Sequence, residues 1–323
     1  MVIDLRYDPR YGALTTEFFD FRAELSEINN IDPRLLRPTN GATGALGAVF
    51  SSRRMQDVRQ GKPSSALMAS LEYFDAHRML VLYGFDVQKV PNPSIEYPVA
   101  EVIDALQGEP SILYLSVPNN PTGKLLPEEE LDRILYHASS ETRVVIDRTL
   151  VHPQEYCRMD LLGKRHSGKD IVIVDSFSKS LGLIKERVGY FMANREETIV
   201  GIHPFAHAPN SIAMNCVREL LPIQEELLKE VTARHDQSNE LLRKWGESQS
   251  TVVYHPSISN VALIELLEMS GEGCRSELEK RDILLRSGKD LFIGPRYIRI
   301  NLGQPEKIPE FLDAMDSILA GSE

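Results

Sequence analysis

Four short runs rich in valine, isoleucine and leucine alternate with longer amphipathic segments, and this alternation constrains the fold more than any other feature. The runs span residues 66–71, 111–117, 142–147 and 170–176. The segments around them predict helices that begin near Thr43, Asp75 and Pro127. Such a pattern is typical of a mostly parallel sheet wound by crossover helices, so we predict an α/β core. Polar residues that follow the strands should then lie at the carboxyl ends, where open α/β sheets bind ligands.

The character of the sequence changes after about residue 200. Helical stretches are expected at 203–221 and 222–245, strands at 251–255, 260–266 and 297–302, and a final helix at 306–320. At 323 residues the chain is long for one compact unit and short for three. We therefore expect a large domain over residues 1–215 and a small α+β domain over residues 216–323, preceded by a connecting helix.

Composition limits the classes of binding partner and the cellular compartment that we expect for this protein. A formal net charge of −11 argues against nucleic acid as a partner, because phosphate binding needs clustered lysine and arginine. Cys157, Cys216 and Cys274 are far apart and lack metal-ligand spacing, which favours free thiols in a reducing compartment and no metal site. The sequence shows neither an export signal nor an apolar run long enough to span a membrane, so we expect a cytoplasmic protein.

Residues 175–190, DSFSKSLGLIKERVGY, form the most informative segment. Lys179 directly follows an apolar strand, is flanked by Ser176 and Ser178, and precedes Arg187 by eight positions. A partly desolvated, electropositive setting lowers a lysine pKa and supplies the neutral amine that attacks a carbonyl. The hydroxyls and the guanidinium suit a phosphate group. The alternative for this segment is a solvated lysine in a surface loop.

Two further strand ends carry polar residues that suit a cofactor. Asn120 lies in the turn VPNNPTGK, which proline and glycine explain as a plain turn, although its amide could also bind an aromatic hydroxyl. Asp147 ends a strongly β-forming run, where it could cap a helix or pair with a heteroaromatic N–H. The chain thus presents Asn120, Asp147, Lys179 and Arg187 in that order.

These four pieces together resemble the fold-type I, class I/II aminotransferases, near the histidinol-phosphate aminotransferase branch, over roughly residues 35–315. The resemblance implies that pyridoxal phosphate (PLP) forms a Schiff base with Lys179. It also implies that Asp147 pairs with the pyridine nitrogen, so that the ring accepts electrons from the substrate α-carbon. Asn120 would bind the ring hydroxyl, and Ser176, Ser178 and Arg187 would hold the phosphate.

Matches upstream and downstream extend the resemblance. The segment PTNGATGALGAVF looks like the family's phosphate loop, in which free backbone N–H groups of Ala42 and Thr43 at a helix start attract an anion. Tyr73 occupies the position that stacks an aromatic ring on the cofactor, and we count it with the catalytic candidates Lys179 and Asp147. Arg299, in YIRINL, matches the arginine that binds the substrate α-carboxylate, and Asn120 would contribute to substrate binding. Ile298 and Ile300 should point to the opposite face of that strand.

The sequence departs from the family in two places. Members of the family usually have several dozen more residues before the segment that here starts at Met1, and those residues help to enclose the substrate. Near the start of this chain, Tyr11, or less favourably Tyr7, is the candidate that reaches the phosphate bound in the neighbouring subunit. Leu150 stands where aminotransferases commonly have a tyrosine that donates to the ring hydroxyl, a loss that would raise the pKa of the Schiff base. His152 and Tyr156 are the residues that could compensate.

The resemblance implies a homodimeric PLP-dependent aminotransferase that acts on a small amino acid and a keto acid by a ping-pong cycle, in amino-acid or secondary metabolism. Leu150 and the short N-terminus leave open another PLP reaction, such as decarboxylation, elimination, cyclisation or oxidation. A catalytically silent binding protein is the third alternative, and the joint presence of Lys179, Asp147, Arg187 and Arg299 argues against it.

Overall fold

The computed structural model describes residues 13–92, 94–152 and 156–320. Its main sheet has seven strands in the order β1-β7-β6-β5-β4-β2-β3, and strands β3, β2, β4, β5 and β6 are parallel neighbours. β7 runs antiparallel to both β6 and β1. The strand bounds are β1 Leu36–Thr39, β2 Ser65–Ala69, β3 Asp86–Val90, β4 Ile112–Ser116, β5 Arg143–Asp147, β6 Asp170–Ser176 and β7 Gly189–Ala193. The four strands expected in this part of the chain are therefore confirmed.

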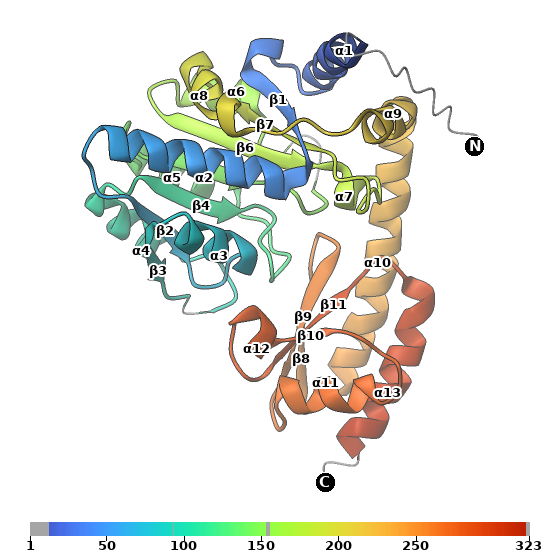
Figure 1. Ribbon diagram of the computed structural model, residues 1–323. Coiled ribbons are helices and arrows are strands. Elements are labelled where there is room, and N and C mark those ends of the chain that lie inside the picture. The colour runs from blue at the N-terminus through green and yellow to red at the C-terminus, as the bar shows by residue number, and fades with distance from the viewer. Residues whose placement is uncertain (1–12, 93, 153–155, 321–323) are drawn as a thin grey trace.

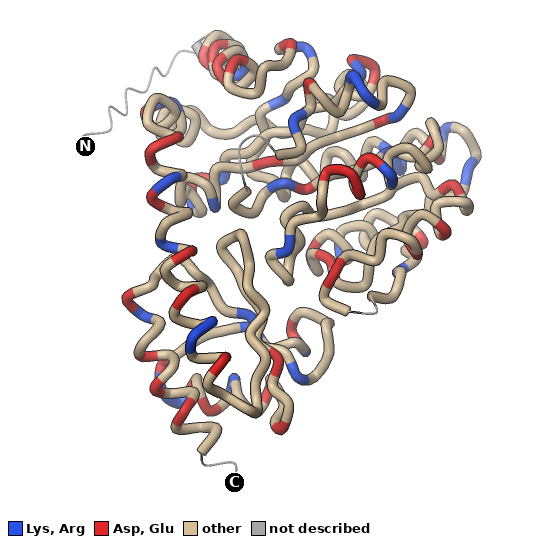
Figure 2. Tube along the Cα trace, turned by 180° about the vertical axis from the view of Figure 1, so that it is seen from behind, with Lys and Arg blue, Asp and Glu red and all other residues tan. Residues whose placement is uncertain are grey.

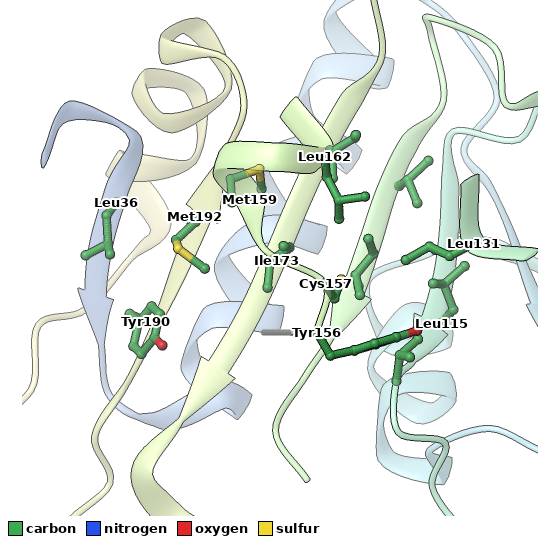
Figure 3. Packing of buried hydrophobic residues seen from close by; sticks show 14 of the residues in the cluster. Leu36, Leu115, Leu131, Tyr156, Cys157, Met159, Leu162, Ile173, Tyr190 and Met192 are labelled. Atoms are coloured by element: carbon green, nitrogen blue, oxygen red, sulfur yellow. The ribbon is translucent and has the colours of Figure 1, made fainter. Parts of the chain in front are cut away.

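Helices cover both faces of this sheet (Figure 1). Side chains of α2 (Gly41–Arg59), α3 (Phe74–Leu82) and α8 (Glu196–Ile202) pack into the core on one face. Those of α1 (Ala13–Ile28), α4 (Val99–Ala105), α5 (Glu128–His137), α6 (Met159–Arg165) and α9 (Ser211–Leu220) pack on the other. β6 is buried on both sides because Ile173 enters one core and Val174 the other. Figure 3 shows Ile173 among the packed residues of the core that includes α5 and α6.

A second sheet follows the long helix α10 (Gln224–Ser248) in the chain and lies beside it (Figure 1). Its four antiparallel strands have the order β10-β11-β9-β8, with bounds β8 Val252–His255, β9 Val261–Leu266, β10 Arg286–Ser287 and β11 Tyr297–Asn301. Residues of α10, α11 (Gly271–Glu279) and α13 (Ile308–Ala320) share a separate apolar core with one face of this sheet. The short helices are α7 (Phe177–Ser180) and α12 (Gly288–Leu291), and 3₁₀ turns cover Pro33–Leu35, Leu106–Gly108, His203–Phe205, Leu221–Ile223 and Pro305–Lys307.

One expected helix is shorter than the sequence suggests. The pattern of the stretch 203–221 predicts a helix throughout, but α9 begins only at Ser211. Pro204 lies in a 3₁₀ turn and Pro209 cannot continue a helical hydrogen-bond pattern, so the chain restarts where the Asn210 side chain accepts the Ala213 N–H at 2.9 Å. The proposed domain boundary after residue 215 falls within α9 and stays a prediction.

Basic and acidic residues are interspersed along the described trace (Figure 2). Among the described helices, none has the length and apolar character needed to cross a bilayer.

Candidate functional site

A cavity of about 320 Å³ opens at the carboxyl ends of β4, β5 and β6 and is bordered by β11 of the second sheet. All predicted site residues within the described ranges line it, from the α2 start to β11: Ala42, Thr43, Tyr73, Asn120, Asp147, Ser176, Ser178, Lys179, Arg187 and Arg299. The fold therefore brings together residues that are up to 257 positions apart in the chain, since Ala42 and Arg299 share one cavity. Tyr11 and Tyr7 lie outside the described residues.

Asp147 ends β5 with its carboxyl in the cavity, only 5% exposed. The Tyr114 hydroxyl donates to Oδ2 at 2.8 Å, and the Thr149 backbone N–H donates to Oδ1 at 3.0 Å. Burial raises the pKa of the Asp147 carboxyl, although these hydrogen bonds act in the opposite direction. A cationic N–H that faced this carboxylate would offset the cost of burying its charge, and the pyridinium of PLP is such a group.

Lys179 projects from α7, the single helical turn that follows β6. The turn is capped by Ser176, whose side chain accepts the Ser178 N–H at 3.4 Å. The pKa of the Lys179 amine is lowered by burial first and then by the positive charges of Arg299 and Arg187. This is the electropositive, partly desolvated setting that the sequence predicted for a reactive amine.

The start of α2 and Arg187 form an anion cradle beside Lys179. Gly41 opens α2 with φ +69°, and a Cβ there would lie 2.7 Å from Arg187 Nη2. A Cβ on Gly189 would lie 2.8 Å from the Ala42 nitrogen, so Gly189 permits the close approach of α2 to β7 and Gly41 leaves room for the Arg187 guanidinium. Arg187 itself has φ +56°, and its Nη1 lies 3.1 Å from the Ile184 carbonyl and 3.5 Å from Ser178 Oγ.

Unpaired N–H groups at the start of a 19-residue helix attract an anion, and an arginine binds phosphate oxygens in a fixed geometry. The residues in this cradle therefore fit a phosphate group. They accord with the predicted roles of Ala42, Thr43, Ser178 and Arg187, which remain a proposal.

Arg299 reaches the cavity from the middle of β11. Its neighbours Ile298 and Ile300 are buried in the core of the second sheet, as alternation along a strand requires. Arg299 Nη1 donates to Asn120 Oδ1 at 3.0 Å, which joins two predicted site residues from different sheets. Arg286 lies opposite Arg299 in the β10–β11 pair, and burial together with this second charge lowers the pKa of Arg299.

Tyr73 lies at the start of α3 with its ring beside the cavity. Its hydroxyl donates to Asp75 Oδ2 at 3.1 Å, and burial raises the pKa of the phenol, with the charge of Asp75 adding to the effect. The phenol is thus neutral at ordinary pH, and its ring is available for stacking.

Leu150 lines the cavity and is 7% exposed, so the wall is apolar where the family commonly has a tyrosine. The two residues that could have compensated lie elsewhere. The Tyr156 hydroxyl donates to the Leu126 carbonyl, and His152 Nε2 lies 3.4 Å from Asp175 Oδ2 in a neighbouring cavity. Neither lines the site cavity, because Tyr156 packs into the core that includes α5 and α6 and His152 lines the neighbouring cavity.

Sequence reasoning missed several residues that shape the site. Tyr114 is fully buried on β4 and orients Asp147, and Ser116 ends β4 at the cavity wall. Glu72 is 3% exposed and bonds Ser116. The one signal for Glu72 was a carboxylate beside the apolar run 66–71, directly before Tyr73.

Comparisons with known proteins agree with this geometry. The family model described as aminotransferase class I and II matches residues 55–315. A histidinol-phosphate aminotransferase of Bacillus pumilus is 29% identical over 226 residues, which are 68% of this chain and 60% of the relative. The chain thus spans about three fifths of that relative's length.

Two solved structures share the fold. A histidinol-phosphate aminotransferase from Clostridium acetobutylicum has a TM-score of 0.79 at 19% identity, covering 93% of this chain and 89% of its own. An L-threonine-O-3-phosphate decarboxylase from Porphyromonas gingivalis has a TM-score of 0.74 at 21% identity, covering 98% of both chains. The expectation of a large, mostly parallel sheet with a smaller α+β part is confirmed.

Proposed function

The chain belongs to the aminotransferase class I and II family, whose members are PLP-dependent, and on that premise we propose that it transfers an amino group between a small amino acid and a keto acid. The observation that carries this proposal is the convergence of Lys179, Asp147, Arg187 and Arg299 on one cavity. Bound there, PLP supplies a ring that accepts the electrons left on the substrate α-carbon.

Each residue of the site has a separate role in binding the cofactor, binding the substrate or moving a proton. The α2 start, Ser178 and Arg187 hold the phosphate, and Asp147 keeps the ring nitrogen protonated. Lys179 would hold the cofactor covalently at rest, and its amine, neutral because its pKa is lowered, would be the group that takes a proton from the substrate α-carbon and gives it back. Arg299, held by Asn120, binds the substrate carboxylate. Two half-reactions on one site give a ping-pong cycle.

A second candidate function uses the same cofactor but breaks a different bond to the substrate α-carbon. Leu150 offers no hydrogen bond to the cofactor ring hydroxyl, and a protein with a similar fold is named a decarboxylase. A site that lacks this donor changes the balance between loss of the α-proton and loss of another α-substituent. Decarboxylation or another amino-acid reaction is therefore the alternative.

We further propose a cytoplasmic homodimer, which the family resemblance and the free thiols of Cys157, Cys216 and Cys274 support. Light scattering on the purified chain tests the dimer, and a monomer at working concentration would contradict it.

The central experiment is borohydride reduction of the PLP-loaded protein followed by peptide mapping. We expect a phosphopyridoxyl group on Lys179, with Lys185→Ala as a control that retains it and Lys179→Ala as a variant that loses it. An unmodified Lys179 peptide would overturn the proposal. Product analysis with and without a keto acid then separates the two reactions, because turnover without an acceptor favours the alternative.

A further inference from the structure

Glu72 is a buried carboxyl that the proposed chemistry does not use. It lies between β2 and α3, directly before Tyr73, and is 3% exposed. Burial raises the pKa of Glu72 well above its usual range, whereas hydrogen bonds from Ser116 lower it. Burying a carboxyl costs free energy unless the carboxyl forms good hydrogen bonds, so the hydrogen-bond partners of Glu72 indicate its role.

Ser116, the last residue of β4, binds the Glu72 carboxyl through both its backbone and its side chain. The Ser116 backbone N–H lies 3.0 Å from Oε2 and 3.2 Å from Oε1, and the Ser116 hydroxyl donates to Oε2. A hydroxyl has one hydrogen, so this bond fixes the direction of the Ser116 O–H and leaves its lone pairs free to accept.

The lone pairs of Ser116 Oγ accept from the turn that carries Asn120. The Asn120 backbone N–H donates to Oγ at 3.0 Å, and Asn119 Nδ2 lies 3.4 Å from the same oxygen. Asn119 Nδ2 also donates to the Leu71 carbonyl at 2.8 Å, beside Glu72 in the chain. The turn is therefore fixed to residues 71 and 72, and the Asn120 side chain points to Arg299.

We propose that Glu72 is a positioning residue for the substrate-carboxylate site, acting through Ser116 and Asn120 on the guanidinium of Arg299. The path consists of the Glu72–Ser116 bond, the Ser116–Asn120 bond at 3.0 Å and the Asn120–Arg299 bond at 3.0 Å. Arg286 faces Arg299 with the same charge, so the orientation of Arg299 depends on an acceptor such as Asn120 Oδ1.

The role of Glu72 requires an acceptor oxygen rather than a charge. A carboxylate, a carboxylic acid and an amide each present one oxygen to the Ser116 hydroxyl. Glu72→Gln therefore keeps the path, and Glu72→Met, of similar length, removes it. Ser116→Ala breaks the path at the next bond and provides a second, independent variant. Glu101→Gln, on the exposed surface of α4, is the matched control.

The test compares two probes on the PLP-loaded protein. 2-Aminoisobutyrate has the amino and carboxylate groups of a substrate, and isopropylamine has the same carbon skeleton without the carboxylate. The Kd of isopropylamine divided by the Kd of 2-aminoisobutyrate, both from absorbance titration, is the ratio that reports the carboxylate site alone. We expect Glu72→Met and Ser116→Ala each to reduce this ratio about fivefold, the size of one lost hydrogen bond. Glu72→Gln and Glu101→Gln should stay within about twofold of the original chain. The double variant Glu72→Met/Ser116→Ala should lose no more than either single variant.

The inference rests on the proposed role of Arg299, so Arg299→Leu is measured in parallel. If Arg299→Leu leaves the ratio unchanged, Arg299 does not bind the substrate carboxylate. That result would overturn both this part of the proposed function and the inference about Glu72. If Arg299→Leu lowers the ratio and Glu72→Met does not, only the inference is overturned. Equal weakening of both probes in Glu72→Met would also overturn it, because that result describes general damage. Should Glu72→Met not fold, the ratio measured for Ser116→Ala decides between these outcomes.

Discussion

Phe74 and Phe292 stack with their ring centroids 4.3 Å apart and their planes inclined by 16°. Phe74 begins α3 directly after Tyr73, whereas Phe292 follows α12 beside the second sheet and has φ +58°. The guanidinium of Arg78 lies 5.7 Å from the centre of the Phe74 ring. This contact joins the two parts of the structure next to a residue that lines the cavity.

We expect Phe292→Ala to weaken substrate binding more than it weakens the fold. The Phe292 side chain is 61% exposed, so its loss removes little core, while stacked rings contribute roughly 0.5–1.5 kcal/mol. The KM for an amino-acid substrate should rise about two- to tenfold, with kcat changed less. Leu284→Ala, at a residue 80% exposed, is the control. An unchanged KM would show that the stack does not help to close the site.

Arg299 should influence the protonation of Lys179. Its charge is one cause of the lowered pKa of Lys179, so Arg299→Leu should raise that pKa. With a higher pKa, a smaller fraction of Lys179 amines is neutral at a given pH. The pH at which the rate of covalent PLP binding to the apoprotein is half of its maximum should therefore rise. Stopped-flow absorbance across a pH series measures this midpoint. Arg286→Leu, whose charge acts on Arg299 instead, should leave it in place. A midpoint that Arg299→Leu leaves unmoved would contradict the electrostatic account.

Gly41→Ala should lower the affinity for PLP. The new Cβ would lie 2.7 Å from Arg187 Nη2, and φ +69° strains any residue with a side chain. We expect at least a tenfold rise in the Kd for PLP, about 1.4 kcal/mol, as Arg187 moves from the cradle. Gly44→Ala meets only an ordinary contact of 3.6 Å in the same helix, and should stabilise the chain by roughly 0.5–1 kcal/mol. Equal PLP affinity in the two variants would refute the steric argument.

His235 should make folding stability depend on pH. It is 3% exposed in α10, and burial lowers its pKa to about 4. An unfolded chain binds the proton near pH 6.5 and the folded chain does not, so stability is complete above that pH and falls as the pH drops towards 4. Between pH 7.5 and 5 the loss attributable to this residue is about 2 kcal/mol. Urea unfolding at both pH values should show a smaller difference for His235→Leu than for the exposed control His137→Leu. The same pH difference in both variants would remove His235 as the cause.

The sequence predicted the elements that position the site better than it predicted the bonds within it. The runs that became β4, β5 and β6 are strongly β-forming, and the polar residues after them reach one edge because parallel strands end together. The bond between Asn120 and Arg299 could not be predicted, because it joins the turn after β4 to β11 of the second sheet, and their relative placement is set by tertiary packing.

One wrong expectation and one alternative that the sequence left open have identifiable physical explanations. The apolar spacing of the stretch 203–221 predicts helix from its start, and Pro204 and Pro209 override that pattern. His152 and Tyr156 follow Leu150 closely in sequence, yet Leu150 lines the cavity and neither of these two residues does. Proximity in sequence beyond the end of a strand is a poor guide to which side of the sheet a residue reaches.

β5 ends with Asp147 followed by Arg148, and the structure sends these neighbours to opposite faces of the sheet, Asp147 into the site cavity and Arg148 into a buried ion pair of 2.9 Å with Asp175. A slip of one residue in the pairing of β5 would exchange them, placing a cation where the cavity already holds Lys179 and leaving Asp175 beside another anion. Charge repulsion would penalise this misaligned state on both faces at once, so Asp147, which serves the site, and Arg148, which does not, together favour the correct register of β5.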